Sequence, residues 1–170
     1  MRIFARKTYI IHLSMQNKYN LDDKDKAILS LLQKHSLITN QDLAKNINLS
    51  NSACLERTKR LFNNGYIKQY TAIVDQFKVG LTVSTLTFVT LNPHNRKTAD
   101  SFVAKIKAIP QIIECHNISG SWDYCLKIVS ENIDNYRNFV LDTLLELPGV
   151  EKIDSQIILK TEKNTSIPIN

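Results

Sequence analysis

The sequence predicts an α+β protein in two parts, a helical part up to Gly65 and a βαββαβ part from Leu81 onward. Three observations support this. Apolar residues recur at spacings of three and four before Gly65, whereas strand-like and helical patterns alternate after Leu81. The charge divides at the same place: residues 1–70 have 12 Lys+Arg and 5 Asp+Glu, and residues 71–170 have 10 and 11. The two parts therefore have net charges of +7 and −1, within a chain of 170 residues that is long enough for two small domains.

The first predicted helix runs from Leu21 to His35. Asp22 is its expected N-cap, and Asp25 follows three residues later, as in a capping box. Acidic residues at this end also suit the positive end of the helix dipole. The apolar residues at helical spacing are Ala27, Ile28, Leu31 and Leu32.

Two short helices joined by a tight turn are predicted between Thr39 and Gly65. Thr39 is the expected cap of the first, with Asp42 as its capping-box partner. The turn passes through Asn48, and Ser50 caps the second helix. Gly65 ends it, because glycine best tolerates the left-handed conformation of a C-terminal cap. Three helices then share one small core.

The segment from Tyr66 to Val74 is rich in β-branched and aromatic residues and is predicted to be a strand or short hairpin. Added to three helices, it would complete a winged helix-turn-helix over residues 21–74. Residues 75–80 form the expected linker. Residues 1–20 combine Arg2, Arg6 and Lys7 with a short apolar run and are predicted to be a flexible arm, with Met15 as an alternative start.

The second part, residues 81–170, is predicted to be a ferredoxin-like βαββαβ sandwich domain. Its expected strands and helices, in order, are 82–91, 98–109, 112–119, 123–130, 132–147 and 150–159. Pro110 and the pair Pro148-Gly149 end the two helices. The four strands should form an antiparallel sheet with both helices on one face.

The strands contain more apolar residues than a sheet covered on one side needs: Phe88, Ile113, Cys115, Leu126, Ile128, Ile157 and Leu159. An exposed apolar sheet face usually marks an interface, so a homodimer through this domain is expected. The odd number of cysteines, Cys54, Cys115 and Cys125, favours a reducing compartment over a disulfide framework. Each lies inside an apolar pattern and is interpreted as a small core residue.

The basic first part points to a polyanion, of which nucleic acid is the simplest. A membrane surface is disfavoured, because no amphipathic basic helix has a broad apolar face and no apolar run approaches the roughly 20 residues of a bilayer span. On the helix after Ser50, Cys54 and Leu61 face inward, and a polar, mostly basic face lies opposite. Such a helix fits the major groove of double-stranded DNA. The predicted DNA-binding residues are Thr39, Asn51, Ser52, Glu56, Arg57, Lys59, Arg60 and Lys68, of which Asn51, Ser52, Glu56 and Lys59 would contact bases and Arg57, Arg60 and Lys68 phosphates.

From Leu21 to Ile169 the sequence resembles the Lrp/AsnC family of bacterial and archaeal transcriptional regulators. The matching motifs are Leu21-Asp22 with Asp25, Leu43-Ala44, Leu49-Ser50, Arg57 with Leu61, Gly65-Tyr66-Ile67, and Ser119-Gly120 with Asp123-Tyr124. Two further runs, Cys54-Leu55-Glu56-Arg57 and Ile113-Glu114-Cys115-His116, resemble the leucine-responsive branch. Some positions differ: Leu37 stands where many relatives have Arg, and Ser121 where Asp is frequent.

The resemblance implies a cytoplasmic, nucleoid-associated prokaryotic regulator that forms dimers and often octamers. It also implies an amino-acid effector, such as leucine, bound between subunits near one loop. The residues of that loop here are Ser119, Gly120, Ser121, Trp122 and Asp123. Gly120 would allow backbone N–H groups to approach a carboxylate, and Asp123 could pair with an α-ammonium group.

Other functions remain as alternatives. No phosphate loop, dinucleotide fingerprint, zinc-helix motif or Gly-x-Ser-x-Gly elbow occurs, so an enzyme is not expected and no catalytic residue, cofactor or metal is predicted. RNA binding by the sheet would need a pattern of aromatic and basic residues that the strand after Trp122 lacks. An amino-acid-binding oligomer with only non-specific nucleic-acid binding stays open.

Overall fold

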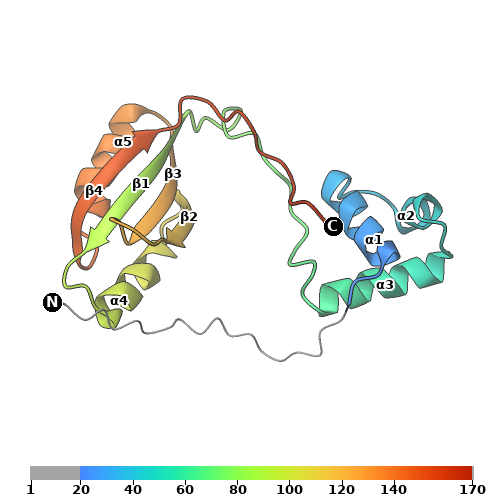
Figure 1. Ribbon diagram of the computed structural model, residues 1–170. Helices are drawn as coiled ribbons and strands as arrows, with labels where there is room; N and C mark the ends of the chain where they lie inside the picture. The colour runs from blue at the N-terminus through green and yellow to red at the C-terminus, as the bar shows by residue number, and fades with distance from the viewer. Residues whose placement is uncertain (1–19, 170) are drawn as a thin grey trace. The chain divides into compact units, whose positions relative to one another are not determined.

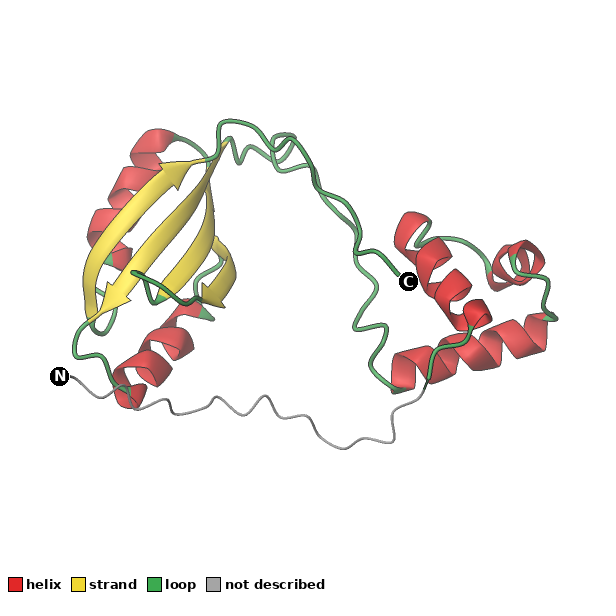
Figure 2. Ribbon diagram, in the orientation of Figure 1, coloured by secondary structure: helices red, strands yellow, loops and turns green. Residues whose placement is uncertain are grey.

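The computed structural model describes residues 20–169 (Figures 1 and 2). These residues form two compact units. One contains the chain up to Ala72 together with the C-terminal tail from Thr165, and the other contains Ile73–Asn164. The predicted N-terminal arm, residues 1–20, lies almost wholly outside the described residues.

The first unit contains α1 (Asp23–Lys34), α2 (Asn40–Asn46) and α3 (Asn51–Asn63). The predicted caps are found. Asp22 accepts the backbone N–H of Asp25 and Asp25 accepts that of Asp22, which completes a capping box. Ser50 accepts the N–H of Ala53 at the start of α3. At the end of α3, Gly65 has φ of +76°, the left-handed conformation that ends a helix.

The cap of α2 differs from the expected capping box. Thr39 Oγ1 accepts the backbone N–H of Asp42 at 3.1 Å, as predicted. The Asp42 carboxylate, however, accepts the Thr39 hydroxyl at 2.7 Å rather than a backbone N–H. In the turn that follows α2, Asn48 has φ of +53°, a left-handed conformation that Asn tolerates better than most residues.

The three helices bury one shared core. Its buried residues are Ile28, Leu29, Leu43, Ala44, Ile47, Cys54 and Leu61. The C-terminal tail also contributes, because Ile169 packs against this cluster. Gln33 on α1 donates to the carbonyl of Ile167 at 3.3 Å. The last residues described therefore belong to the helical unit, as Figure 1 shows for the C-terminus beside α1.

The predicted strand or hairpin from Tyr66 to Val74 is wrong for this structure. Residues 66–82 form no strand, and the sheet made by the described residues consists of β1 to β4. A strand needs a partner for its backbone groups, and residues 20–169 provide no strand that pairs with this segment. Tyr70 instead stacks on Phe62 of α3, with ring centroids 6.4 Å apart.

The second unit has the predicted βαββαβ order (Figure 1). Its elements are β1 (Val83–Leu91), α4 (Arg96–Ile106), β2 (Ile112–Asn117), β3 (Tyr124–Ser130), α5 (Ile133–Phe139) with a π-helical turn η1 (Val140–Leu144), and β4 (Val150–Ile157). The strands are antiparallel in the order β2-β3-β1-β4. The single helix expected over 132–147 is thus α-helical only as far as Phe139.

Both helices cover one face of the sheet. The core beneath them includes Val89 from β1, Leu126 and Ile128 from β3, Phe102 from α4 and Leu144 from η1. Alternate residues along a strand point to opposite faces, so the register assigns each side chain to a face.

The register corrects the prediction of an apolar second face. Leu126 and Ile128 are wholly buried on the helix-covered face, and Ile157 pairs with Thr85, which also lies on that face. On the open face, Leu86 and Phe88 of β1 are half-buried. Polar and charged side chains of the other three strands share this face: Glu114, His116, Lys127, Lys152 and Asp154.

The prediction that the cysteines are core residues is confirmed for Cys54 and wrong for Cys115. Cys54 is wholly buried in the helical core, and this burial raises the pKa of its thiol. Cys125 is half-buried. Cys115 is exposed, because β2 is an edge strand and five of its six residues face solvent. All three are free thiols.

Candidate nucleic-acid interface and effector loop

Helix α3 has one buried and one exposed face, as predicted. Cys54 and Leu61 are inaccessible to solvent, and Thr58 between them donates its hydroxyl to the carbonyl of Cys54 at 2.9 Å. Ser52, Glu56 and Lys59 are exposed on the other side. The helix therefore presents a polar surface of hydrogen-bonding groups that includes the exposed cation of Lys59.

The start of α3 is held firmly. Ser50 Oγ lies 3.2 Å from Ser52 Oγ while it caps the helix. Asn40 on α2 donates to the carbonyl of Asn51 at 2.9 Å, which joins the two helices across their turn. Asn51 and Ser52 thus stand at the exposed N-terminal end of α3, the part of a recognition helix that approaches base edges.

Arg57 is placed differently from the other predicted DNA-binding residues. Its Nη1 lies 2.6 Å from Asp22 Oδ2 and 2.9 Å from Asp25 Oδ1. Both carboxylates raise the pKa of the guanidinium, Asp22 more than Asp25. The pKa of Asp22 lies below its usual range, chiefly because it accepts the backbone N–H of Asp25 and then because of Arg57. Sequence periodicity did not indicate this network, because Asp25 and Asp22 precede Arg57 by 32 and 35 residues.

Three other predicted DNA-binding residues are more accessible than Arg57. Arg60 is partly exposed, with Nη2 3.8 Å from Asp25 Oδ1. Lys68 is exposed and follows the end of α3 at Gly65. Thr39 is exposed at the start of α2, where its hydroxyl is engaged by Asp42.

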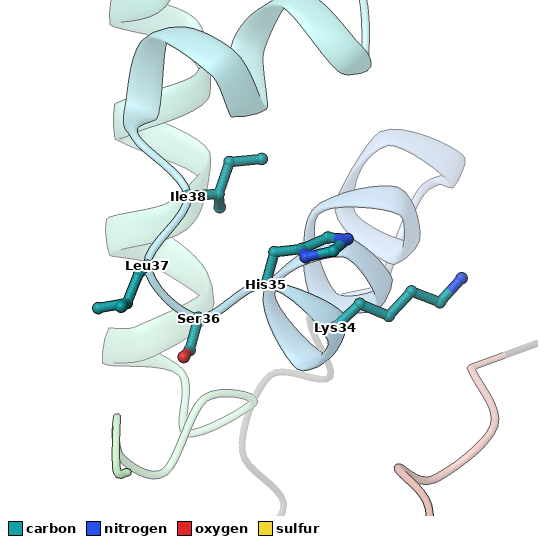
Figure 3. A pocket seen from close by; sticks show the side chains of 5 residues that line it. All are labelled: Lys34, His35, Ser36, Leu37 and Ile38. Carbon is teal, nitrogen blue, oxygen red and sulfur yellow. The ribbon is translucent and has the colours of Figure 1, made fainter.

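Leu37 lies in the connection between α1 and α2. Its side chain is 96% exposed, so it adds no packing at the position where relatives often have Arg. Together with Lys34, His35, Ser36 and Ile38 it lines an open pocket (Figure 3). Because these residues are consecutive, the pocket is the hollow of one turn, and no second element closes it.

The predicted effector loop joins β2 to β3. Gly120 has φ of +126°, a conformation that only glycine adopts readily, and a Cβ built there would meet nothing within 4 Å. Ser119, Gly120 and Ser121 are exposed. This part of the loop leaves its backbone open to a ligand.

Asp123 makes several interactions within its own chain. Its Oδ2 accepts the backbone N–H of Leu91 at 2.8 Å, and its Oδ1 lies 3.2 Å from His94 Nδ1. Its backbone N–H donates to the carbonyl of Val89. The carboxylate, which is only 20% exposed, therefore ties the loop to the end of β1 and to the loop before α4.

Trp122 has two partners that the sequence did not indicate. Its ring lies 6.1 Å from that of Phe88 on β1, and Lys152 Nζ on β4 lies 5.1 Å from its centroid. Phe88 and Lys152 lie on the open face of the sheet, so Trp122 covers one end of that face. Only the strand register brings these three residues together.

Among residues 20–169, no group of three or more His, Cys, Asp or Glu side chains could hold a metal ion. None of the helices in that range is long and apolar enough to cross a bilayer.

Both units of the chain match models of known protein families. Residues 84–168 match the family model of the Lrp/AsnC ligand binding domain, and residues 21–68 match a winged helix-turn-helix DNA-binding model. The chain belongs to the Lrp/AsnC family of transcriptional regulators. The predicted resemblance is confirmed, and this Lrp/AsnC protein is a DNA-binding transcriptional regulator with a ligand-binding domain. Its family consists of regulators, in agreement with the prediction that it is not an enzyme.

Two curated relatives show the extent of the likeness. This Lrp/AsnC protein is 47% identical to the transcriptional regulator AzlB of Bacillus subtilis over 88% of its length and 96% of that protein. It is 34% identical to the leucine-responsive regulatory protein of Salmonella typhimurium over 86% and 90%.

Solved structures agree with the fold. The transcriptional regulator NMB0573 of Neisseria meningitidis, in complex with L-Met, is 33% identical, with a TM-score of 0.85 over 89% of this chain and 98% of that one. Bacillus subtilis LrpC is 30% identical, with a TM-score of 0.75 over 86% and 99%. The predicted α+β fold with helix-turn-helix and βαββαβ parts is confirmed, apart from the strand over 66–74.

Proposed function

We propose that α3 is the recognition helix and that Asn51, Ser52, Glu56 and Lys59 contact base edges in the major groove. The observation that supports this most is the exposed polar face of α3, on a helix whose opposite face buries Cys54 and Leu61 completely. Polar side chains near the start of such a helix can discriminate bases by hydrogen bonds. Thr39, Arg60 and Lys68 contact phosphates beside it.

We propose that each predicted domain has its own function. Residues 21–74 bind DNA, residues 75–80 connect, and residues 81–170 sense the effector and assemble the protein. The regulator acts in the prokaryotic cytoplasm, associated with the nucleoid.

The proposed DNA-binding form is a homodimer that can assemble further into an octamer. The half-buried Leu86 and Phe88 on the open sheet face support an interface in this domain. Two α3 helices would enter successive major grooves, about 34 Å apart or a multiple of that. A roughly palindromic operator is therefore expected.

The proposed effector is a small amino acid bound at the loop of Ser119, Gly120, Ser121, Trp122 and Asp123. The open backbone around Gly120 supports a carboxylate site, and Asp123 supplies negative charge for an α-ammonium group. Leucine is the first candidate, as in the name of the Salmonella relative. Methionine is the second, because the Neisseria regulator was solved with L-Met.

An effector would change DNA binding only if it favoured one assembly or helix spacing by free energy, and coupling of about 1–3 kcal/mol is typical. Sedimentation with and without leucine or methionine, and then with operator DNA, tests assembly and effector together. If calorimetry detects no binding of leucine, methionine or any other common amino acid, the effector proposal is wrong.

The DNA proposal is tested with the double variant Lys59→Ala/Arg60→Ala. The operator is first selected from a random DNA library with the wild-type protein. The variant should bind it more weakly and with a smaller dependence on salt, because each lost phosphate contact lowers the slope of log K against log[salt] by roughly 0.9. If the variant keeps the wild-type affinity and salt slope, α3 is not the recognition helix. Equal wild-type affinity for operator and random DNA would instead favour the non-specific alternative.

A further inference from the structure

One guanidinium nitrogen of α3 binds two carboxylates at the start of α1. Arg57 Nη1 lies within 2.9 Å of both Asp22 and Asp25. Asp25 is wholly buried, whereas the side chain of Arg57 is 26% exposed. Distances of 2.6 and 2.9 Å are those of charge-assisted hydrogen bonds, which are stronger than neutral ones.

The same two carboxylates also form the capping box of α1. Asp22 accepts the N–H of Asp25, Asp25 accepts the N–H of Asp22, and Arg57 joins the pair from the other helix. The direction of each carboxylate is therefore already set by the α1 backbone. Arg57 thereby connects the middle of α3 to a fixed point on α1.

We propose that Arg57, held by Asp22 and Asp25, is a positioning residue that sets the rotation of α3 for base reading and does not bind a phosphate. This inference rests on the proposed role of α3 as the recognition helix. At about 100° per residue, Arg57 lies on the flank of α3, about 60° around the helix from the buried Cys54. A contact on the flank resists rotation of the helix on its packed face, and rotation is the motion that would move Ser52, Glu56 and Lys59 away from base edges.

A phosphate contact by Arg57 would break this network. The guanidinium would leave two carboxylates, one of them without solvent exposure, and the loss of a close cation from a buried carboxylate is costly. Lys59, on the exposed side of the same helix, can meet a phosphate or a base without such a loss. Arg57 is therefore poorly placed as a phosphate ligand, although its residue type suggested that role.

The test compares full-length wild type with Arg57→Ala, Asp22→Asn and Lys59→Ala. Each protein is titrated, over a range of salt concentrations, with the operator selected by wild type and with random-sequence DNA of equal length. Asn is also a good N-cap, so Asp22→Asn removes the charge and leaves the helix start capped. Circular dichroism at the assay temperature confirms that each variant is folded.

A positioning role predicts that Arg57→Ala and Asp22→Asn both lower the ratio of operator affinity to random-DNA affinity, by about tenfold, as expected when a base contact is lost. Their salt slopes should match that of wild type. A phosphate role predicts the reverse: Arg57→Ala weakens both DNAs equally and lowers the slope by roughly 0.9, and Asp22→Asn strengthens binding without changing the ratio. Either that pattern or an unchanged ratio in both variants overturns the proposal.

If Arg57→Ala does not fold, Asp22→Asn decides alone, since the two roles predict opposite changes in its affinity for the operator. The Lys59→Ala protein distinguishes a failure of the positioning role from a failure of the proposed role of α3 as the recognition helix. If Lys59→Ala leaves operator affinity and slope unchanged, α3 is not the recognition helix. If Lys59→Ala weakens binding while Arg57→Ala and Asp22→Asn keep the wild-type ratio, only the positioning role fails.

Discussion

Arg57 Nη1 lies 2.9 Å from Oδ1 of Asp25, a carboxylate that is inaccessible to solvent. This ion pair joins α3 to the buried side of α1, and Asp22 is a second partner of Arg57 at 2.6 Å. The interaction therefore affects the stability of the helical unit as well as the position of α3.

Replacing Arg57 with Ala should destabilise the helical unit by about 2 kcal/mol, because a buried carboxylate loses a charged hydrogen-bond partner. Urea unfolding followed by circular dichroism measures this. The single tryptophan, Trp122, lies in the sheet unit, so its fluorescence transition should not move. Arg96→Ala is the matched control: Arg96 and Asp100 form an exposed pair at 3.5 Å, and its loss should cost less than about 0.5 kcal/mol. Equal effects of the two variants would contradict the prediction.

The stability of the helical unit should fall in acid partly through Asp22. Its pKa in the folded protein lies below the ordinary value of 3.8, so the folded state binds this proton more weakly than the unfolded chain does. The stabilisation is complete above about pH 4 and is lost as the pH falls through the folded-state pKa. Asp22→Asn lacks this titration, so the difference in unfolding free energy between it and wild type should shrink from pH 6 to pH 3. A constant difference would show that Asp22 does not titrate in this way.

The C-terminal tail should stabilise the helical unit through Ile169, which packs against its core. Ile169→Ala removes partly buried apolar surface and should lower the unfolding free energy by about 1 kcal/mol. Ile167→Ala is a suitable comparison, because that side chain is 75% exposed and only its carbonyl binds Gln33. Thermal unfolding by circular dichroism should show a lower midpoint for Ile169→Ala alone. A similar midpoint for both variants would mean that the tail contributes no packing.

Replacing Asp123 with Asn should separate loop structure from effector charge. Asn keeps an oxygen for the N–H of Leu91 but cannot pair ionically with His94 or with an α-ammonium group. We expect a folded protein whose affinity for the amino-acid effector falls at least about tenfold, the loss of one charged hydrogen bond. Calorimetry with leucine and methionine measures this, and Ser121→Ala in the same loop retains the charge. Full effector affinity in Asp123→Asn would assign Asp123 a structural role only.

Local signals predicted the helical unit well. Asp22, Ser50 and Gly65 each act on backbone groups within a few residues, so their sequence context was sufficient to place the helix ends. The strands of the sheet unit were also predicted within a few residues, because alternating and terminating residues are local features. The family resemblance supplied the functional class.

Features that depend on distant partners were predicted less well. The segment 66–74 has the composition of a strand, but a strand forms only where another backbone pairs with it. Leu126 and Ile128 were assigned to the wrong face because the register with β1 is not encoded in either strand alone. The contact of Arg57 with Asp22, 35 residues earlier in the chain, was not predicted, because no local pattern links the two residues.

The most direct test of α3 as the DNA-reading helix is site-specific cross-linking. Cys115 is exposed and would react with the probe, so the background is Cys115→Ser. A photo-cross-linker is attached at Ser52→Cys on α3 or, as a control, at Lys105→Cys on α4, and each protein is irradiated on the selected operator. Ser52→Cys should cross-link to bases in two half-sites about one helical turn apart, or a multiple of that, and Lys105→Cys should give no base cross-links. Cross-links absent from Ser52→Cys, or equal from the two positions, would contradict the assignment of α3.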